Sequence, residues 1–526
     1  MARYALVSVF DKTGVVELCQ RLVELGYGIL STGGTATHLR NAGLAVKDVE
    51  EHTGFPEMLD GRVKTLHPRI HAGLLALRNH PQHQESLRQH QIDPIDLVVV
   101  NLYPFTDTVS RQDATFEECI EMIDIGGPSM LRAAAKNFHG CIPLVDPADY
   151  KWVLDKLAED SLTATDRQKL AAKVFAVTAA YDGFVADYLL RAEHTAVVSD
   201  DKSISSEFPM QFHYVAISKQ SLRYGENPHQ AAHFYRDLQA SPASIAAAQQ
   251  LQGKELSYNN IQDADAAIQI LRGLDDLQTA AVVAVKHMNP CGIGLGETLE
   301  EAYARAYEAD PVSIFGGIVA LNRVVNRSVA EKMAELFLEI IIAPDFTSEA
   351  LAVLARKKNV RLLTVDMVKP LHQPGDVTFR RVSGGLLVQE VDTFVSSPKT
   401  WRVVTHRAPS EEEWRALQFA WRTVRYVKSN AIVVANAFQT LGIGPGQTNR
   451  VGAAEIALRQ AGSRAVGAVL ASDAFFPMRD TVDAAASAGI AAIVQPGGSI
   501  RDAESVEAAN EKQIAMVFTG ERHFLH

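Results

Sequence analysis

The chain of 526 residues has little cysteine, and no pattern that is typical of disulfides or of zinc sites. Its four cysteines, Cys19, Cys119, Cys141 and Cys291, lie far apart and never form a C-x-x-C. Neither a disulfide framework nor a zinc ribbon is therefore indicated. A reducing compartment fits such a sequence, and we predict a cytoplasmic location.

Long apolar runs and a surplus of basic residues are also missing. No apolar stretch reaches the roughly 18 residues that span a bilayer, and Asp11 comes too early for a signal peptide. The formal charge of −11 at pH 7 argues against a general nucleic-acid binder. We therefore expect neither a membrane nor a nucleic acid as partner, and any anionic ligand must be held by local basic clusters.

The common motifs for dinucleotides, ATP and zinc are absent. The segment Gly442–Arg450, expected to be a loop, has Gln447 where G-x-G-x-x-G needs its last glycine, and no G-x-x-x-x-G-K-[ST] occurs. The zinc-deaminase signature fails because Gly294 stands where its second cysteine belongs, and the one H-x-E, His83–Glu85, lies far upstream. We predict that no metal is required.

What is present is ordinary globular composition, with 47% apolar and 21% charged residues, over a length that indicates several domains. Short apolar runs alternate with segments of helical spacing, which predicts a parallel α/β sheet at the N-terminal end. The expected elements are strands at Tyr4–Phe10, Tyr27–Leu30, Leu97–Val100 and Ile142–Val145, a turn at Ser31–Thr35, and helices at Val15–Leu25, Ala36–Ala42 and Thr163–Leu190.

The polar stretch His194–Pro209 breaks this periodicity and is the predicted linker. We therefore expect one domain at residues 1–195 and a second α/β region at 210–526. In the second region, buried strands are expected at Thr279–Val285, Ile314–Leu321, Ala431–Ala435, Ala465–Ala471 and Ala491–Val494. Glu411–Glu413 is interpreted as the exposed first turn of a helix.

Two loops in the first domain have the composition of a phosphate site. Asp11–Gly14 follows the first strand and Ser31–Thr35 follows the second. Each places small residues and hydroxyls at a helix N-terminus, where free N–H groups favour a phosphate. Either loop alone is also explained by an ordinary glycine turn with a helix cap. The two in register favour one phosphate site between them.

Three further segments of this domain are candidates for a ligand site. Gly61–Pro68 carries two cations and an imidazole on a turn-like segment, and Asn101–Phe105 begins where a predicted strand ends. Asp124–Pro128 leads a helix that later carries Lys136. Asp124, Tyr103, Lys64 and Lys136 offer proton acceptors and donors. Alternatively, Lys136 is an exposed helical lysine.

In the second region, Ser221–Gln230 is too polar and turn-rich for a core segment and is typical of a ligand-contacting loop. Lys286 and His287 follow directly on a predicted strand. A cation beside an imidazole supplies a general base and a group to stabilise an oxyanion, although a lone histidine is more often structural.

The segments DKTG, STGGT, GRVKTLHP, NLYPF, DIGGPS, RAAAKN, LRYGENPHQ, KHMNPCG, GIGPGQTNR, Ser472–Asp480 and the terminal Arg522–His526 together extend over the whole chain. In them the sequence closely resembles the bifunctional purine-biosynthesis family that combines AICAR (aminoimidazole carboxamide ribotide) formyltransferase with IMP (inosine monophosphate) cyclohydrolase. The resemblance implies an enzyme that transfers a formyl group from 10-formyltetrahydrofolate to AICAR and then dehydrates and cyclises the product, FAICAR, to IMP.

The resemblance also implies a fold and an assembly. The first domain is expected to have a methylglyoxal-synthase-like α/β fold, and the second region two cytidine-deaminase-like α/β units without zinc. The co-substrate is 10-formyltetrahydrofolate, and the assembly is a homodimer whose transfer site is shared between subunits.

Site residues follow from the resemblance position by position. For cyclisation they are Lys12, Thr13, Gly14, Thr32, Gly33, Gly34, Thr35, Arg62, Lys64, Thr65, Asn101, Tyr103, Asp124, Ile125 and Lys136, the last as proton donor and acceptor. For transfer they are Arg223, Tyr224, Lys286, His287, Gly316, Glu339, Asn430, Arg450, Phe475 and Arg522 around the ribotide, and Asp480, Ser499 and Ile500 near the folate.

The sequence departs from the family pattern at two of these regions. Phe10 stands where the family often has a serine, which weakens one phosphate contact, and Glu339 stands where an aspartate is often found.

Two other functions compete with this interpretation of the sequence. A deaminase would bind zinc and release ammonia, and a nucleotide sensor or scaffold would bind IMP without turnover.

Overall fold

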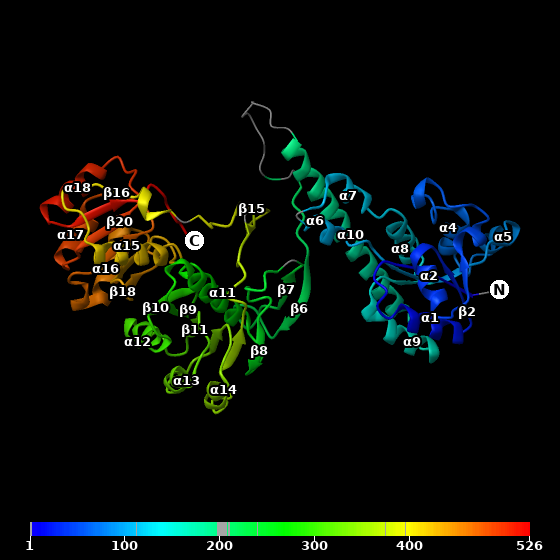
Figure 1. The fold of residues 1–526 in the computed structure, drawn as a ribbon, viewed down its shortest axis with the longest axis horizontal. Helices are drawn as coiled ribbons and strands as arrows, with labels where there is room; N and C mark the ends of the chain where they lie inside the picture. The colour runs from blue at the N-terminus through cyan, green and yellow to red at the C-terminus, as the bar shows by residue number, and fades with distance from the viewer. Residues whose placement is uncertain are drawn as a thin grey trace. The chain divides into compact units, whose positions relative to one another are not determined.

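The computed structural model describes residues 3–111, 113–196, 208, 211–238, 240–373, 375–394 and 396–526. They form two compact units, Met1–Val215 and Ala216–His526 (Figure 1). Of the predicted linker His194–Pro209, only the first three residues, which end a helix, and Phe208 lie within the described residues. The remainder lies outside them, and the predicted domain limits stay a prediction.

Unit 1 is built on a five-stranded sheet in the order β3-β2-β1-β4-β5, in which all paired strands run parallel. The predicted parallel sheet is thus confirmed. The strands are β1 Arg3–Val9, β2 Tyr27–Ser31, β3 Val46–Asp48, β4 Ile95–Asn101 and β5 Ile142–Leu144. The helices are α1 Val15–Glu24, α2 Gly33–Asn41, α3 Val49–Thr53, α4 Pro68–Leu75, α5 Pro81–Gln89, α6 Phe105–Val109, α7 Phe116–Glu121, α8 Gly126–Lys136, α9 Tyr150–Ala158 and α10 Ala164–Ala196.

Both faces of this sheet are covered. Successive side chains of a strand point to opposite faces, so Ala5 and Val7 join a core with α1 and α9, whereas Leu6 joins a core with α4, α8 and α10. This explains why the central strands β1 and β4 carry apolar residues on both faces. One local prediction was wrong: α2 begins at Gly33 rather than Ala36, because Thr32 already has the extended backbone of a helix N-cap.

Unit 2 contains two six-stranded sheets, in the orders β10-β9-β11-β12-β13-β8 and β16-β21-β20-β19-β17-β18. Its strands are β6 Ala216–Leu222, β7 Ala232–Asp237, β8 Gln249–Gln252, β9 Ala280–Lys286, β10 Asn289–Gly296, β11 Ile318–Leu321, β12 Ile340–Ala343, β13 Arg361–Thr364, β14 Val377–Val382, β15 Gly385–Glu390, β16 Arg402–Val403, β17 Ile432–Ala435, β18 Thr440–Gly444, β19 Val469–Ser472, β20 Ala492–Gln495 and β21 Ala515–Phe518. Its helices are α11 Tyr258–Arg272, α12 Leu299–Ala309, α13 Arg327–Ala334, α14 Ser348–Leu354, α15 Glu411–Val424, α16 Arg450–Ala461, α17 Asp480–Ser487 and α18 Asp502–Glu511.

The two sheets of unit 2 repeat one topology. In each, a helix precedes an antiparallel hairpin, β9–β10 or β17–β18, and three strands that alternate with helices follow. A sixth strand, β8 or β16, pairs antiparallel with the last of these three, β13 or β21. The strand after the hairpin, β11 or β19, pairs antiparallel with β9 or β17, and the next two pairings are parallel. One apolar core includes residues of both halves, such as Ile268 and Val283 from the first and Phe419 and Val433 from the second.

Several expectations for unit 2 need correction. The expected strands Ile314–Leu321 and Ala465–Ala471 begin later, at Ile318 and Val469, because turns precede them. The supposed loop Gly442–Arg450 starts inside strand β18. The expectation for Glu411–Glu413 is confirmed, since these residues form the first turn of α15 behind a Ser410 capping box. Among the described helices, none is long and apolar enough to cross a membrane.

Glycine allows the hairpins of both halves to pack unusually close to a helix. A Cβ on Gly294 would lie 2.2 Å from the carbonyl oxygen of Ala302 in α12, and one on Gly444 would lie 1.9 Å from that of Ala453 in α16. Any side chain larger than hydrogen would therefore push strand and helix apart. Gly442 and Gly444 of GIGPG thus serve packing, whereas Gly446 has a φ of 66° and open space around its Cβ position.

Candidate functional site

A cavity of about 680 Å³ opens at the carboxyl edge of the unit 1 sheet, where β1, β2 and β4 end. This is the edge at which open α/β sheets bind ligands. It brings together most of the residues predicted for cyclisation: Lys12, Thr32, Gly33, Gly34, Thr35, Arg62, Lys64, Thr65, Asn101, Tyr103, Asp124 and Ile125. Thr13, Gly14 and Lys136 are not among the lining residues.

One end of this cavity is suited to an anion. The N-terminal residues of α2 and α8 line it and present backbone N–H groups there. The Lys12 ammonium donates to Thr35 Oγ1 at 3.2 Å, and burial lowers the pKa of Lys12. Gly33, with φ of 54°, leaves room for Lys64, whose Nζ would be 3.1 Å from a Cβ there. A phosphate at this end would meet two cations and two helix N-termini.

The loop that follows β1 is fixed by Asn101, at the end of β4. Its Oδ1 accepts from the backbone N–H groups of Phe10 and Asp11 at 2.6 and 2.9 Å, and its Nδ2 donates to the Asp11 carbonyl at 3.0 Å. Asn101 therefore joins two strand ends through side-chain bonds. The Phe10 ring packs edge-on to Tyr103, with 5.8 Å between the ring centroids, so the residue that departs from the family pattern contacts a predicted catalytic side chain.

Acidic residues balance the cations. Lys64 Nζ lies 2.5 Å from Glu57 Oε2, and Arg62 pairs with Glu121. Glu57 and Glu121 also line the cavity. An anionic ligand that drew Lys64 and Arg62 toward itself would compete with these two carboxylates.

Asp124 is a partly buried acid of this cavity, just before α8. Burial raises the pKa of Asp124, and the N–H of Gly127, which donates to Oδ1 at 2.8 Å, offsets part of that rise. Burial, followed by the nearby charges of Asp124 and Glu57, raises the pKa of Tyr103. A carboxyl whose pKa is shifted toward neutrality is suited to proton transfer.

Tyr181 of α10 holds the backbone of Asp124 in place. The Asp124 N–H donates to the Tyr181 hydroxyl at 2.8 Å, and that hydroxyl donates to the Met122 carbonyl at 3.0 Å. Tyr181 is 9% exposed. No sequence signal marked it, because it falls in a helix among other apolar residues.

Lys136 lies elsewhere in unit 1. It is exposed in the last turn of α8, whereas the first turn of that helix lines the cavity. An α-helix rises 1.5 Å per residue, so the ten residues between Gly126 and Lys136 correspond to roughly 15 Å along the axis. The role of Lys136 in proton transfer stays a prediction.

A second cavity, of about 900 Å³, lies wholly in unit 2. It contains these residues predicted for the ribotide: Arg223, Tyr224, Lys286, His287, Gly316 and Glu339. Lys286 ends β9, and its ammonium donates to the Phe315 carbonyl at 2.9 Å. Lys286 was expected to follow its strand, yet it is the last residue of β9, which is antiparallel to both neighbours. The β9–β10 turn presents His287 instead.

Glu339 is engaged by a residue that the sequence did not single out. Its Oε2 accepts from the Arg361 guanidinium at 2.7 Å, and Arg361 also donates to the carbonyls of Lys254 and Glu255. The side chain of Arg361 is 12% exposed. The carboxylate of Glu339, which is one methylene longer than aspartate, thus forms an ion pair with Arg361.

The other residues predicted for transfer lie outside this cavity. Arg450, 6% exposed, donates to Asn430 Oδ1 at 2.7 Å and to Ser472 Oγ at 2.8 Å, and it pairs with the fully buried Asp473. Phe475 is 39% exposed, the Arg522 guanidinium lies 4.3 Å from the Phe524 ring centroid, and Ile500 is fully exposed. Asp480 begins α17 and accepts from the Thr481 N–H, and Ser499 accepts from the Arg501 N–H.

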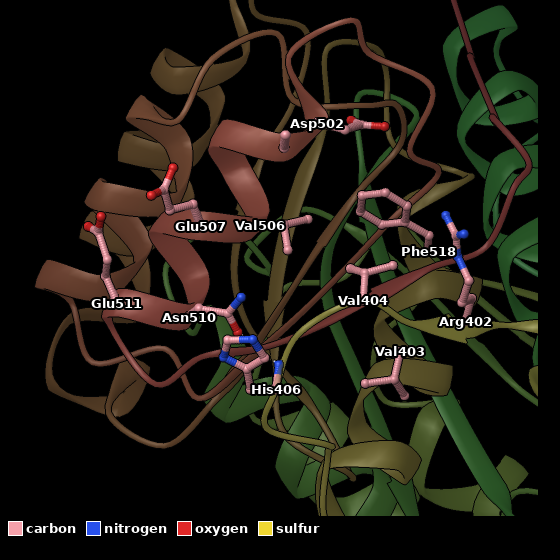
Figure 2. A pocket seen from close by; sticks show the side chains of 11 residues that line it. Arg402, Val403, Val404, His406, Asp502, Val506, Glu507, Asn510, Glu511 and Phe518 are labelled. Carbon is pink, nitrogen blue, oxygen red and sulfur yellow. Dashed lines mark hydrogen bonds between the residues drawn. The ribbon is translucent and has the colours of Figure 1, made fainter.

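A third hollow, of about 590 Å³, lies between α18 and the edge strand β16 (Figure 2). Val404, Val506 and Phe518 contribute apolar surface to it. Asn510 lies beside His406 in Figure 2 and accepts from its backbone N–H at 2.8 Å. None of the predicted site residues lines this hollow, and we assign it no ligand.

Within the part of the chain that the structure describes, no group of three histidine, cysteine, aspartate or glutamate side chains is arranged to hold a metal ion. The four cysteines are unpaired thiols.

Two family models match this chain. A family described as the AICARFT/IMPCHase bienzyme matches residues 134–460, and an MGS-like domain matches residues 14–129. The second match confirms the methylglyoxal-synthase-like (MGS-like) fold expected for the N-terminal part.

Curated relatives are similar over their full length. The bifunctional purine biosynthesis protein PurH of Anoxybacillus flavithermus is 57% identical over 528 residues, covering 100% of both chains. The PurH proteins of Halalkalibacterium halodurans and Streptococcus suis are 56% and 55% identical, again over 100% of both chains.

Proposed function

The chain belongs to the AICARFT/IMPCHase bienzyme family, and from this membership we propose that its two units divide two consecutive reactions between them. The protein is a bifunctional enzyme of purine biosynthesis, with AICAR formyltransferase and IMP cyclohydrolase activities. The observation that carries the division is that each unit holds its own cavity, lined by residues predicted for one reaction. We assign cyclisation to unit 1 and formyl transfer to unit 2.

In the unit 1 cavity, ring closure joins the carboxamide nitrogen of FAICAR to its formyl carbon and expels water. Lys12 and the N-termini of α2 and α8 would hold the ribotide phosphate. Asp124, with its raised pKa, would take a proton from the attacking nitrogen, and Tyr103 and Lys64 would donate to the departing oxygen. Holding the two reacting groups in contact supplies much of the acceleration. Lys136 is retained as proton donor and acceptor on the family resemblance alone.

In the unit 2 cavity, the amine nitrogen of AICAR attacks the formyl carbon of 10-formyltetrahydrofolate. His287 would remove the amine proton, and Lys286 would stabilise the oxyanion of the tetrahedral intermediate. The bond between the formyl carbon and N10 of the folate then breaks, and N10 takes up a proton. The products are FAICAR and tetrahydrofolate. We assign the side chains of Asp480, Ser499 and Ile500 to folate binding. The steps of formyl transfer given above need no metal.

We further propose a homodimer. Asn430, Arg450, Phe475 and Arg522 are assigned to the same ribotide as Arg223, yet they do not line its cavity, which favours a transfer site completed by a second copy. The hairpin β14–β15 also supports a partner. It joins no other strand among the described residues and exposes Val382 and Leu387 at 41% and 61%. A lone two-stranded hairpin is marginally stable in water.

The compartment is proposed to be the cytoplasm, because four unpaired thiols fit a reducing environment.

A coupled absorbance assay with AICAR and 10-formyltetrahydrofolate, with a chelator present, tests the function. We expect tetrahydrofolate and IMP to form. Binding of IMP without turnover would favour a sensor or scaffold. Ammonia release that depends on zinc would favour a deaminase. Sedimentation of the purified enzyme tests the homodimer separately.

A further inference from the structure

The turn that presents His287 has a backbone that its residues rarely adopt. Lys286 pairs with Asn289 across the hairpin, which leaves His287 and Met288 as the two central residues. Their φ angles are 55° and 62°. A two-residue hairpin turn with both central φ values positive is of type I′, which usually contains asparagine and glycine. A side chain at each position makes this backbone costly, so the surrounding structure must hold it.

Asp263 of α11 supplies the contacts that hold this turn. Its Oδ1 accepts from the backbone N–H of Met288 at 2.7 Å, and its Oδ2 accepts from that of His287 at 3.3 Å. One carboxylate therefore bonds the N–H groups of both residues with positive φ. The Asn289 side chain adds a bond from its Nδ2 to the His287 carbonyl at 3.1 Å.

The helix that carries Asp263 is itself fixed. Ser257 and Asn260 form a capping box at its start, and Ala264, Ala267 and Ile268 are fully buried in the core shared by both sheets. A carboxylate on such a helix has a defined position relative to β9. Asp263 therefore holds the exposed His287 at a defined position relative to the core.

We propose that Asp263 is a positioning residue for formyl transfer, whose carboxylate holds the strained turn so that the His287 imidazole faces the substrate. This rests on the proposed role of His287 as general base. A competing role exists, because Asp263 also lines the 900 Å³ cavity and a direct contact with the ribotide would equally make it necessary. The two roles differ in how they depend on the backbone of Met288.

The experiment is a double-mutant cycle on the full-length enzyme, with formyl transfer and cyclisation measured separately. Asp263→Ala is expected to lower kcat for transfer by about 10²-fold, the loss that a misplacement of roughly 1 Å causes. KM for AICAR should change by less than about threefold, because substrate binding is retained. Asp263→Asn, which can still accept from Met288, should lose less.

Met288→Gly removes the side chain that disfavours positive φ. In that background, Asp263→Ala should cost less than about tenfold, because glycine adopts the turn without the carboxylate. An equal loss in both backgrounds, or a rise in KM in place of a fall in kcat, would overturn the positioning role.

Asp265→Asn is the matched control. Asp265 lies on the same helix but accepts from Gln269, and it does not line the cavity. Its transfer rate should stay near that of the wild type. Wild-type enzyme and His287→Ala, measured alongside, separate the possible failures. An inactive wild type would refute the proposed function, and an active His287→Ala would refute the base. Normal transfer by Asp263→Ala, with both of those as expected, would refute the inference alone.

Discussion

Tyr181→Phe is the sharpest test of the cyclisation site, because it deletes one oxygen atom and leaves the ring. The hydroxyl accepts from the Asp124 N–H at 2.8 Å and donates to the Met122 carbonyl at 3.0 Å. Its loss leaves a partly buried N–H without this acceptor, at a cost of up to about 1–3 kcal/mol. If the whole cost appears in the transition state, kcat/KM for cyclisation falls about 5- to 150-fold, since 1.36 kcal/mol is a factor of ten.

The assay is the steady-state conversion of added FAICAR to IMP, together with thermal unfolding of the same preparation. Tyr27→Phe is the control. Tyr27 is 3% exposed and accepts from Arg3, but it lies at the start of β2, away from the carboxyl edge. We expect both variants to lose some stability and only Tyr181→Phe to lose cyclisation. A lower unfolding temperature with unchanged kcat/KM would show that Tyr181 supports the fold without positioning Asp124.

Three further predictions concern separate parts of the chain. Because burial raises the pKa of Asp124, its ionised form is lost as the pH falls through a value above 3.8. Cyclisation should therefore have its acid limb above that value, which a profile of kcat/KM against pH would check. Lys136→Ala should abolish cyclisation and leave transfer intact, and unchanged IMP production from added FAICAR would make Lys136 an ordinary exposed lysine. Gly444→Ala should destabilise unit 2 by at least about 1–3 kcal/mol through overpacking, measured by denaturant unfolding. Gly385→Ala, whose Cβ would meet only Val382 at 3.5 Å, should differ little from wild type.

The sequence predicts a site well where chain order decides which residues meet. Lys12, Thr32 and Asn101 follow three strands that pair in parallel, so their meeting at one edge follows from the topology. Tyr181 and Asp263 could not be found in this way. Tyr181 contacts the backbone 57 residues earlier, and Asp263 contacts the backbone 25 residues later, through hydrogen bonds that depend on how a helix packs.

The hairpins of unit 2 show a second limit. Gly292 and Gly294 disfavour a strand by local propensity, yet both lie in β10, because α12 approaches so closely that no Cβ fits. Only the packed structure reveals that advantage. Arg450 shows the same limit. It was expected to contact the substrate, yet within one chain it donates to Asn430 and pairs with Asp473.

The core shared by the two repeated sheets has a consequence for synthesis on the ribosome. Ile268 and Val283 of the first half pack in the same core as Ala515 and Val517, which come later in the chain and belong to the second half. The first half, although it has a complete sheet, therefore keeps an apolar face uncovered until these residues of the second half have been made. Unit 1 has no such requirement, because the described residues that form its cores all belong to unit 1. Domains generally fold as units, N-terminal first. A nascent chain paused within unit 2 would therefore carry a folded unit 1 and an incomplete unit 2 that is prone to aggregate.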